Sequence, residues 1–145
     1  MWIYQNKEIK SIGDLPEQCF GFIYLITRIA DGKFYVGKKL IQHKKTKKLG
    51  KKAILLQEGR GRKKRKEVSY EESDWIDYWG SSKPLLEDIS KLGEDKFSKE
   101  IIHFAFKSKQ LNYLETKEQF VREVLEVKNS YNTNISGRFF PSDIY

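Results

Sequence analysis

Residues 21–37 read GFIYLITRIADGKFYVG, two short apolar runs on either side of the polar turn Ala30-Asp31-Gly32. An Asp-Gly pair between two such runs indicates a β-hairpin, and we expect its strands at 21–28 and 33–37. Tyr24 lies in the first strand and Tyr35 in the second. Tyrosines at matched places on adjacent strands can lie side by side on one face of a sheet. The hairpin alone does not decide whether this pair serves packing or chemistry.

Positive charge is concentrated in one internal segment. The chain has a formal net charge of +8, and residues 38–66 hold 14 of its 28 Lys and Arg with one acid, Glu58. The rest of the chain carries 14 basic and 19 acidic residues. So dense a basic block attracts a polyanion, and nucleic acid is the usual one. A solubilising loop or a disordered tail is the alternative, and the internal position argues against a tail.

Length and composition indicate a single domain, residues 1–145, of an intracellular protein. No apolar run approaches the roughly 20 residues that span a bilayer. The N-terminal residues lack the pattern of a signal peptide. The single cysteine, Cys19, excludes an internal disulfide and a multi-cysteine zinc site. We therefore expect a cytoplasmic protein without membrane contacts.

The other elements are predicted from apolar periodicity and capping residues. Residues 1–19 are expected to form an edge element, and the glycine-punctuated basic insert, 38–66, short helices joined by loops. A helix is predicted over 84–92, a strand over 97–106, and a long helix from Ser108 to about Val127. The fold class is therefore α/β of the mixed α+β kind: a small, mainly antiparallel three-stranded sheet flanked by helices, with a basic insert after the second strand.

Two glutamates lie beside the apolar stripe of the long helix. At about 100° per residue, Glu118 falls between Leu125 and Leu111, and Glu115 falls just past Leu111. A carboxylate in that position needs a partner if it is buried. The partner is either a Lys or Arg side chain or a divalent cation, for which a carboxylate oxygen is a suitable ligand.

Several stretches together resemble the GIY-YIG nucleases. Phe22-Ile23-Tyr24, a gap of ten residues and Tyr35-Val36-Gly37 are similar to the paired motif of that family. A long helix with a glutamate and then Tyr131-Asn132 follow in the family's order, and residues 78–82, YWGSS, resemble phage-borne members. The resemblance covers residues 21–135. It implies a homing or DNA-processing endonuclease of phage type in the cytoplasm of a bacterium or of a phage-infected cell.

The resemblance also implies a mechanism, the hydrolysis of a DNA phosphodiester with one divalent cation, Mg²⁺ or Mn²⁺, held by Glu115. Tyr24 acts as the general base or positions the water, and Tyr35 orients the water and the phosphate. Lys45, ten residues after Tyr35, stabilises the phosphate, and Asn132 orients the site. A metal and a lysine reduce the phosphodiester's negative charge and stabilise the charge of the pentavalent transition state. A phenol, with a reference pKa near 10, is a weak base at neutral pH unless its pKa is lowered.

The chain departs from the family pattern in its first glycine and its arginine. Phe22 stands where the motif's first glycine would be. A lysine replaces the usual arginine, and a lysine binds phosphate as a point charge rather than as a fork. The surrounding lysines leave the position open, so Lys39, Lys44 and Lys48 are alternatives to Lys45.

Two further assignments stay open. By the resemblance, the family's spacing from the glutamate to Tyr-Asn favours Glu115 as the metal ligand, whereas helix geometry alone favours Glu118. His43 and Tyr78 are candidates for an additional His or Tyr of the family's site. His103, in an apolar strand, is better explained by packing.

The basic insert is expected to contact phosphates of double-stranded DNA, which gives affinity and salt dependence but no sequence information. The residues assigned to this contact are Lys38, Lys39, Lys44, Lys47, Lys48, Lys51, Lys52, Arg60, Arg62, Lys63, Lys64 and Arg65. No separate recognition domain is recognisable, so specificity must come from the insert, a homodimer or a separate partner. The alternatives to an endonuclease are a non-catalytic nucleic-acid-binding protein with the same fold and basic face, and an assembly protein with a basic arm.

Overall fold

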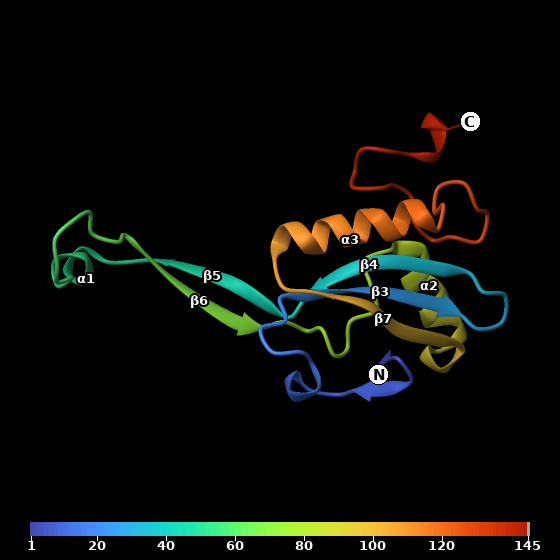
Figure 1. Ribbon diagram of the computed structural model, residues 1–145, viewed down its shortest axis with the longest axis horizontal. Helices are drawn as coiled ribbons and strands as arrows, with labels where there is room; N and C mark the ends of the chain where they lie inside the picture. Colours follow the sequence, from blue (N-terminus) through green and yellow to red (C-terminus); the bar gives the residue numbers. More distant parts are fainter. Residues whose placement is uncertain (145) are drawn as a thin grey trace. The chain divides into compact units, whose positions relative to one another are not determined.

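The computed structural model describes residues 1–144 and divides the chain into two units (Figure 1). Residues 42–73 form one unit, called the ribbon here. The rest of the chain, residues 1–41 and 74–144, forms the other, called the body. None of the helices described over residues 1–144 has both the length and the apolar character that a membrane crossing needs.

A five-stranded mixed sheet forms the centre of the body, in the order β2-β1-β7-β3-β4. Its strands are β1 (Trp2–Tyr4), β2 (Lys7–Ile9), β3 (Gly21–Arg28), β4 (Phe34–Leu40) and β7 (Phe97–Ala105). Strands β7, β3 and β4 are antiparallel neighbours, so the predicted hairpin and third strand are confirmed. The prediction of only three strands is wrong, because β1 pairs with β2 and runs parallel to β7. Strands of three residues are too short to show an alternating pattern in the sequence.

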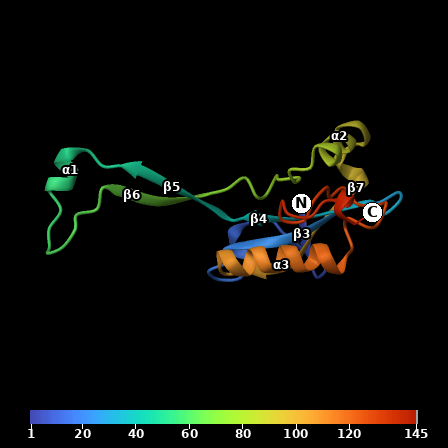
Figure 2. The ribbon, with the colours of Figure 1, turned by 90° about the horizontal axis from the view of Figure 1, so that it is seen from above.

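Two helices lie on opposite sides of this sheet (Figure 2). Helix α2 (Lys83–Leu92) begins as expected, because Ser82 Oγ accepts a hydrogen bond from the Leu85 N–H, and it ends at Gly93 with φ 96°. Helix α3 (Ser108–Val121) is shorter than predicted. It ends because Arg122 leaves helical geometry and Glu123 adopts φ 51°. Three 3₁₀ turns complete the body, at Ile12–Asp14, Glu94–Lys96 and Pro141–Asp143.

Each face of the sheet buries its own apolar cluster. Helix α3 covers one face, where Leu111 packs against Ile23 and Val36. The other face carries Phe22, Tyr24 and Ile26 and is covered by α2 and two buried tryptophans. Trp2 closes this second cluster, because its indole Nε1 donates a hydrogen bond to the Trp75 carbonyl at 2.6 Å.

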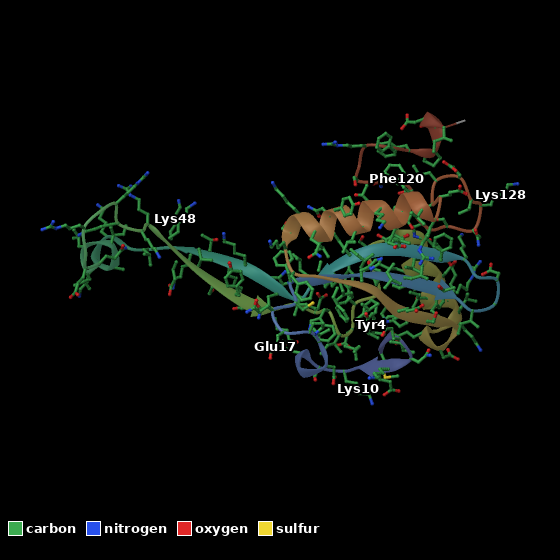
Figure 3. All side chains as sticks on the ribbon, viewed as in Figure 1. Tyr4, Lys10, Glu17, Lys48, Phe120 and Lys128 are labelled. Carbon is green, nitrogen blue, oxygen red and sulfur yellow. The ribbon has the colours of Figure 1, made fainter. Side chains whose placement is uncertain are left out.

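The ribbon is a two-stranded antiparallel hairpin, β5 (Gln42–Lys48) with β6 (Lys66–Glu72), and it carries the short helix α1 (Lys51–Leu55) between its strands. The prediction of short helices joined by loops is therefore wrong for most of the insert. Residues 38–40 belong to β4, and the insert extends beyond residue 66 to the end of β6. Every residue of β5 and β6 is solvent-exposed, and side chains such as Lys48 project from the strands (Figure 3).

Candidate active site

Three phenol side chains gather on one face of the sheet. The register pairs Tyr24 with Gly37 and Ile26 with Tyr35, which places both motif tyrosines on the same face. Their ring centroids are 6.1 Å apart. Tyr78, from the segment before α2, packs edge-on against Tyr24 with a centroid distance of 6.1 Å. The candidate Tyr78 thus lies beside the motif pair.

Gly37 leaves the space that the Tyr24 ring occupies. A Cβ atom at position 37 would lie 2.6 Å from Tyr24 Cζ and 2.9 Å from Tyr35 Cε1, closer than real Cβ contacts allow. Gly80, with φ +91°, lies against the same two rings, and a Cβ there would be 3.3 Å from Tyr24 Oη. The glycine of the YVG stretch is therefore required by the ring of the first tyrosine.

A buried lysine holds the Tyr78 segment in place. Lys99 of β7 donates hydrogen bonds to the carbonyls of Ile76 at 3.1 Å and Tyr78 at 2.9 Å. Its ammonium also lies 4.3 Å from the ring centroid of Trp2. Burial lowers the pKa of Lys99 to about 8. The side chain fixes the backbone that presents Tyr78 to Tyr24.

The two motif tyrosines differ in exposure. Tyr24 is 1% exposed, and burial, followed by the nearby Tyr35 and Tyr78, raises the pKa of its phenol well above the ordinary value. Tyr35 is half-buried, and its Oη lies 3.3 Å from Ser81 Oγ. Burial raises the pKa of Tyr35 as well. Both phenols therefore carry their protons at neutral pH, in the form that donates hydrogen bonds.

Glu115 approaches the same strand from the helix side of the sheet. It shares a pocket with Tyr35 and Asn132. Its side chain is 15% exposed, and its Oε1 lies 3.2 Å from the ammonium of Lys38. Lys38 also donates a hydrogen bond to Asn112 Oδ1 at 2.7 Å. The carboxylate thus reaches the pocket that Tyr35 lines, although the tyrosines and α3 belong to opposite faces.

Glu118 has protein partners on both carboxylate oxygens. His103 Nε2 lies 2.7 Å from Oε1, and Arg122 Nε donates to Oε2 at 3.1 Å. Burial acts to raise the pKa of Glu118, but the bonds and charges of His103 and Arg122 outweigh it, and the pKa is lowered. These contacts give Glu118 the basic partners of a structural carboxylate.

Asn132 bonds to the open edge of β4. Its Oδ1 accepts from the Val36 N–H at 3.0 Å, and its Nδ2 donates to the Val36 carbonyl at 2.8 Å. The preceding Tyr131 continues this edge through its own N–H, which donates to the Phe34 carbonyl at 2.7 Å. The Asn132 side chain thus makes the two hydrogen bonds with Val36 that the backbone of a neighbouring strand would otherwise make.

Gln119 is a site residue that the sequence reasoning missed. It is buried, lines the pocket of Glu115, and donates from Nε2 to the Val36 carbonyl at 3.4 Å. Its Oε1 has no hydrogen-bond partner among residues 1–144. The available signal was its place one helical turn after Glu115, on the same side of α3.

The donor set suits a cation that keeps most of its own water. Residues 1–144 contain no group of three or more His, Cys, Asp and Glu placed to hold a metal. The pocket is nevertheless lined by Glu115, whose carboxylate is a suitable ligand, and by Gln119, whose amide oxygen is buried without a hydrogen-bond partner among the described residues. Mg²⁺ is commonly bound by one or two protein oxygens together with waters and substrate phosphates. The residues present therefore fit such a cation.

The candidate lysines fall in different units. Lys39 lies in the body on the tyrosine side of β4, with its ammonium 3.7 Å from the Tyr78 ring centroid and 2.5 Å from Asp74 Oδ1. Lys45 lies on β5 and pairs with Glu71 at 2.7 Å. The ribbon also holds His43 and these other predicted contact residues: Lys44, Lys47, Lys48, Lys51, Lys52, Arg60, Arg62, Lys63, Lys64 and Arg65. Among the four alternatives for the phosphate lysine, Lys39 is the one that the body contains.

The comparisons with known proteins identify one family. A family model described as "Putative endonuclease segE, GIY-YIG domain" matches residues 2–135. This match spans the hairpin, the ribbon, both long helices and Tyr131-Asn132. The searches of curated proteins and of solved structures gave no match.

The fit of Tyr24 against Gly37 predicts a cost for Gly37→Ala. The new methyl group must displace one of two packed rings, so we expect the free energy of unfolding to fall by about 1–3 kcal/mol. Gly50→Ala is the matched control, since nothing lies within 4 Å of a Cβ there, and its expected effect is within about 0.5 kcal/mol. Urea denaturation measures both. Equal stability of the two variants would contradict the proposed packing role of Gly37.

The partners of Glu118 predict a pH-dependent contribution to stability. Because its folded-state pKa lies below the ordinary 4.5, the contribution is complete above about pH 4.5 and is lost as pH falls through the folded-state value. We expect Glu118→Gln to lower the free energy of unfolding by about 1–2 kcal/mol at pH 7, with a gap to wild type that narrows as the pH falls below 4.5. Denaturation series at several pH values measure this, with the exposed Glu17→Gln as control. A gap that widens below pH 4.5 would refute it.

Proposed function

The chain belongs to the SegE-type GIY-YIG endonuclease family, and we propose that it hydrolyses DNA phosphodiesters in a metal-dependent reaction at the edge of β4. The observation that carries this proposal is the pocket that Glu115 and Tyr35 share. It gathers a carboxylate and a phenol from opposite faces of one sheet. A group of this kind suits a phosphate bound at the edge strand.

Glu115 and Gln119 are the proposed holders of one divalent cation, Mg²⁺ or Mn²⁺. Such a cation would reduce the charge of the phosphate and stabilise the charge added in the transition state. Glu115 supplies the carboxylate, and the buried Gln119 supplies an amide oxygen that has no other partner among the described residues. The ammonium of Lys38 lies 3.2 Å from Glu115 and balances the charge of this carboxylate.

The phenols act as donors in this proposal. Tyr24 is buried with a raised pKa, which favours a role in positioning over a role as general base. Tyr35 is more exposed and lines the pocket, so it is the phenol that would contact the water and the phosphate. Asn132 is a positioning residue, because both polar groups of its amide bond the backbone of Val36.

We expect Glu115→Gln to reduce Mg²⁺-dependent nicking of supercoiled plasmid by about 100-fold or more, since the neutral amide removes the charge that holds the cation. Glu118→Gln, its neighbour on α3, should retain nicking within about threefold when measured well below its unfolding transition. Mobility-shift assays in EDTA should show unchanged DNA binding for both.

Two outcomes of that comparison would count against the proposal. A Glu115→Gln variant that nicks plasmid at the wild-type rate would show that Glu115 has no part in the mechanism. Wild-type protein that binds DNA but nicks in neither Mg²⁺ nor Mn²⁺ would establish the alternative, a non-catalytic nucleic-acid-binding protein. The ion pair of Glu115 with Lys38 is compatible with this alternative as well, because it does not require a bound metal.

The phosphate lysine can be identified by comparing Lys39→Ala with Lys45→Ala. Because Lys39 lies against Tyr78 in the body, we expect its removal to slow single-turnover cleavage at saturating enzyme by about 10- to 100-fold. Lys45→Ala should leave that rate unchanged, since the ammonium of Lys45 pairs with Glu71. The reverse pattern would assign the catalytic role to Lys45. Circular dichroism controls for folding in both variants.

A further inference from the structure

The ribbon carries a charge equal to that of the whole chain. Residues 42–73 contain 12 of the 28 Lys and Arg but 4 of the 20 Asp and Glu, a formal net charge of +8. The remaining residues, 16 basic and 16 acidic, have no net charge. Long-range attraction of a polyanion is therefore a property of the ribbon's residues.

The two faces of the ribbon differ in composition. Strand register places Lys44 opposite Tyr70, Thr46 opposite Val68, and Lys48 opposite Lys66. These six residues share one face, called the open face here, with Gln42 and Glu72 at its base. The open face thus carries Thr46, Val68 and Tyr70 in its middle part, with lysines at both ends of the row.

The opposite face, called the paired face here, carries acids among its lysines. Its residues are His43, Lys45, Lys47, Glu67, Ser69 and Glu71. Lys45 forms an ion pair with Glu71 at 2.7 Å, and the register sets Lys47 opposite Glu67. Carboxylates on this face repel a phosphate backbone and reduce the charge of their neighbours. The paired face is therefore the poorer surface for DNA.

The open face exposes an aromatic and an aliphatic side chain to solvent, and their exposure does not stabilise the hairpin. Tyr70 is 62% exposed and Val68 is 47% exposed. All residues of both strands are solvent-exposed, so the ribbon buries no core of its own between β5 and β6. Isolated two-stranded hairpins are marginally stable in water. A partner that covers the open face would bury these side chains.

The ribbon has the dimensions of a groove-reading element. Its strands of seven residues extend about 23 Å. The major groove of B-DNA is about 12 Å wide and admits a two-stranded ribbon. Threonine can bond to several bases and its methyl group, like other apolar groups, contacts the thymine methyl group. Lysines at the ends of the row are placed for the flanking phosphates.

We propose that the open face of the ribbon reads base sequence in the DNA major groove through Thr46, Val68 and Tyr70, while Lys44, Lys48 and Lys66 bind phosphates. This inference rests on the proposed DNA substrate but not on cleavage. It assigns sequence specificity to the insert, which phosphate contacts alone would not provide. Target choice then needs no separate recognition domain.

Selection of bound duplexes from a randomised pool, followed by sequencing, tests this proposal. The full chain is used in EDTA, so no cleavage occurs. We expect the wild type to enrich a short motif, and Thr46→Ala/Val68→Ala to reduce the preference at one or two adjacent base pairs by about tenfold, with affinity for random DNA within about threefold. Ser69→Ala, which changes the neighbour of Val68 on the paired face of β6, should keep the wild-type motif.

The lysines give a second, independent readout. Lys44→Ala/Lys48→Ala should weaken binding to all duplexes alike and reduce the slope of log affinity against log salt concentration by about 2. A motif that changes in this variant but not in Thr46→Ala/Val68→Ala would overturn the assignment. Circular dichroism shows whether each variant keeps its fold.

Three other outcomes also overturn it. These are a wild type that enriches no motif, a motif altered equally by Ser69→Ala, and binding to phosphatidylserine vesicles with no preference among duplexes, which would assign the basic ribbon to an anionic membrane. Plasmid nicking is measured separately. Nicking without an enriched motif would support the endonuclease proposal and contradict sequence reading by the ribbon. An enriched motif without nicking would support sequence reading and contradict the endonuclease proposal.

Discussion

The bond between the Asn132 amide and the backbone of Val36 fixes the strand on which the candidate site is built. An edge strand exposes unpaired N–H and C=O groups, and a second strand there would cover the residues beside it. The Asn132 side chain satisfies both groups of Val36 within a single residue. Tyr35 and Gly37, the neighbours of Val36, are thereby held without being covered by another strand.

Gly37 provides the second constraint on the same strand. The missing side chain lets the Tyr24 ring extend from β3 beneath β4, next to Tyr35 and Tyr78. On the other face, α3 brings Glu115 to the pocket that Tyr35 lines. Groups from opposite faces of a sheet can share a pocket only where the sheet ends. The position of β4 in the strand order therefore explains why the paired motif lies on this hairpin.

The sequence predicted the elements whose signals are local and strong. The Asp-Gly turn located the hairpin, and capping residues located α2. It did not predict β1 and β2, which have three residues each, or the end of α3, where Glu123 turns to a positive φ. It also missed the ribbon, because a strand such as QHKKTKK lacks the apolar alternation of a half-buried strand. The pairing with β6 is what makes that segment extended.

For the candidate site, the roles of the named residues stay predictions, and the sequence could not show which of two neighbouring residues makes a given contact. Glu115 and Glu118 both border the apolar stripe. They differ in the side chains that contact them, since His103 and Arg122 bond to Glu118. Counting residues selected Lys45, which the structure places in the ribbon, whereas Lys39 lies in the body against Tyr78. Both distinctions depend on contacts between residues distant in sequence. A position count along the chain cannot contain that information.

The charge distribution completes the physical account of the two units. A body with no net charge can hold Tyr24 neutral and Glu118 ionised through local contacts, free of a strong field from its own surface. A ribbon with all the net charge can attract a polyanion without a core that its lysines would disrupt. Concentrating the charge in one exposed hairpin therefore separates two demands that conflict in a uniformly basic domain, long-range attraction of DNA and burial of ionisable groups beside the site.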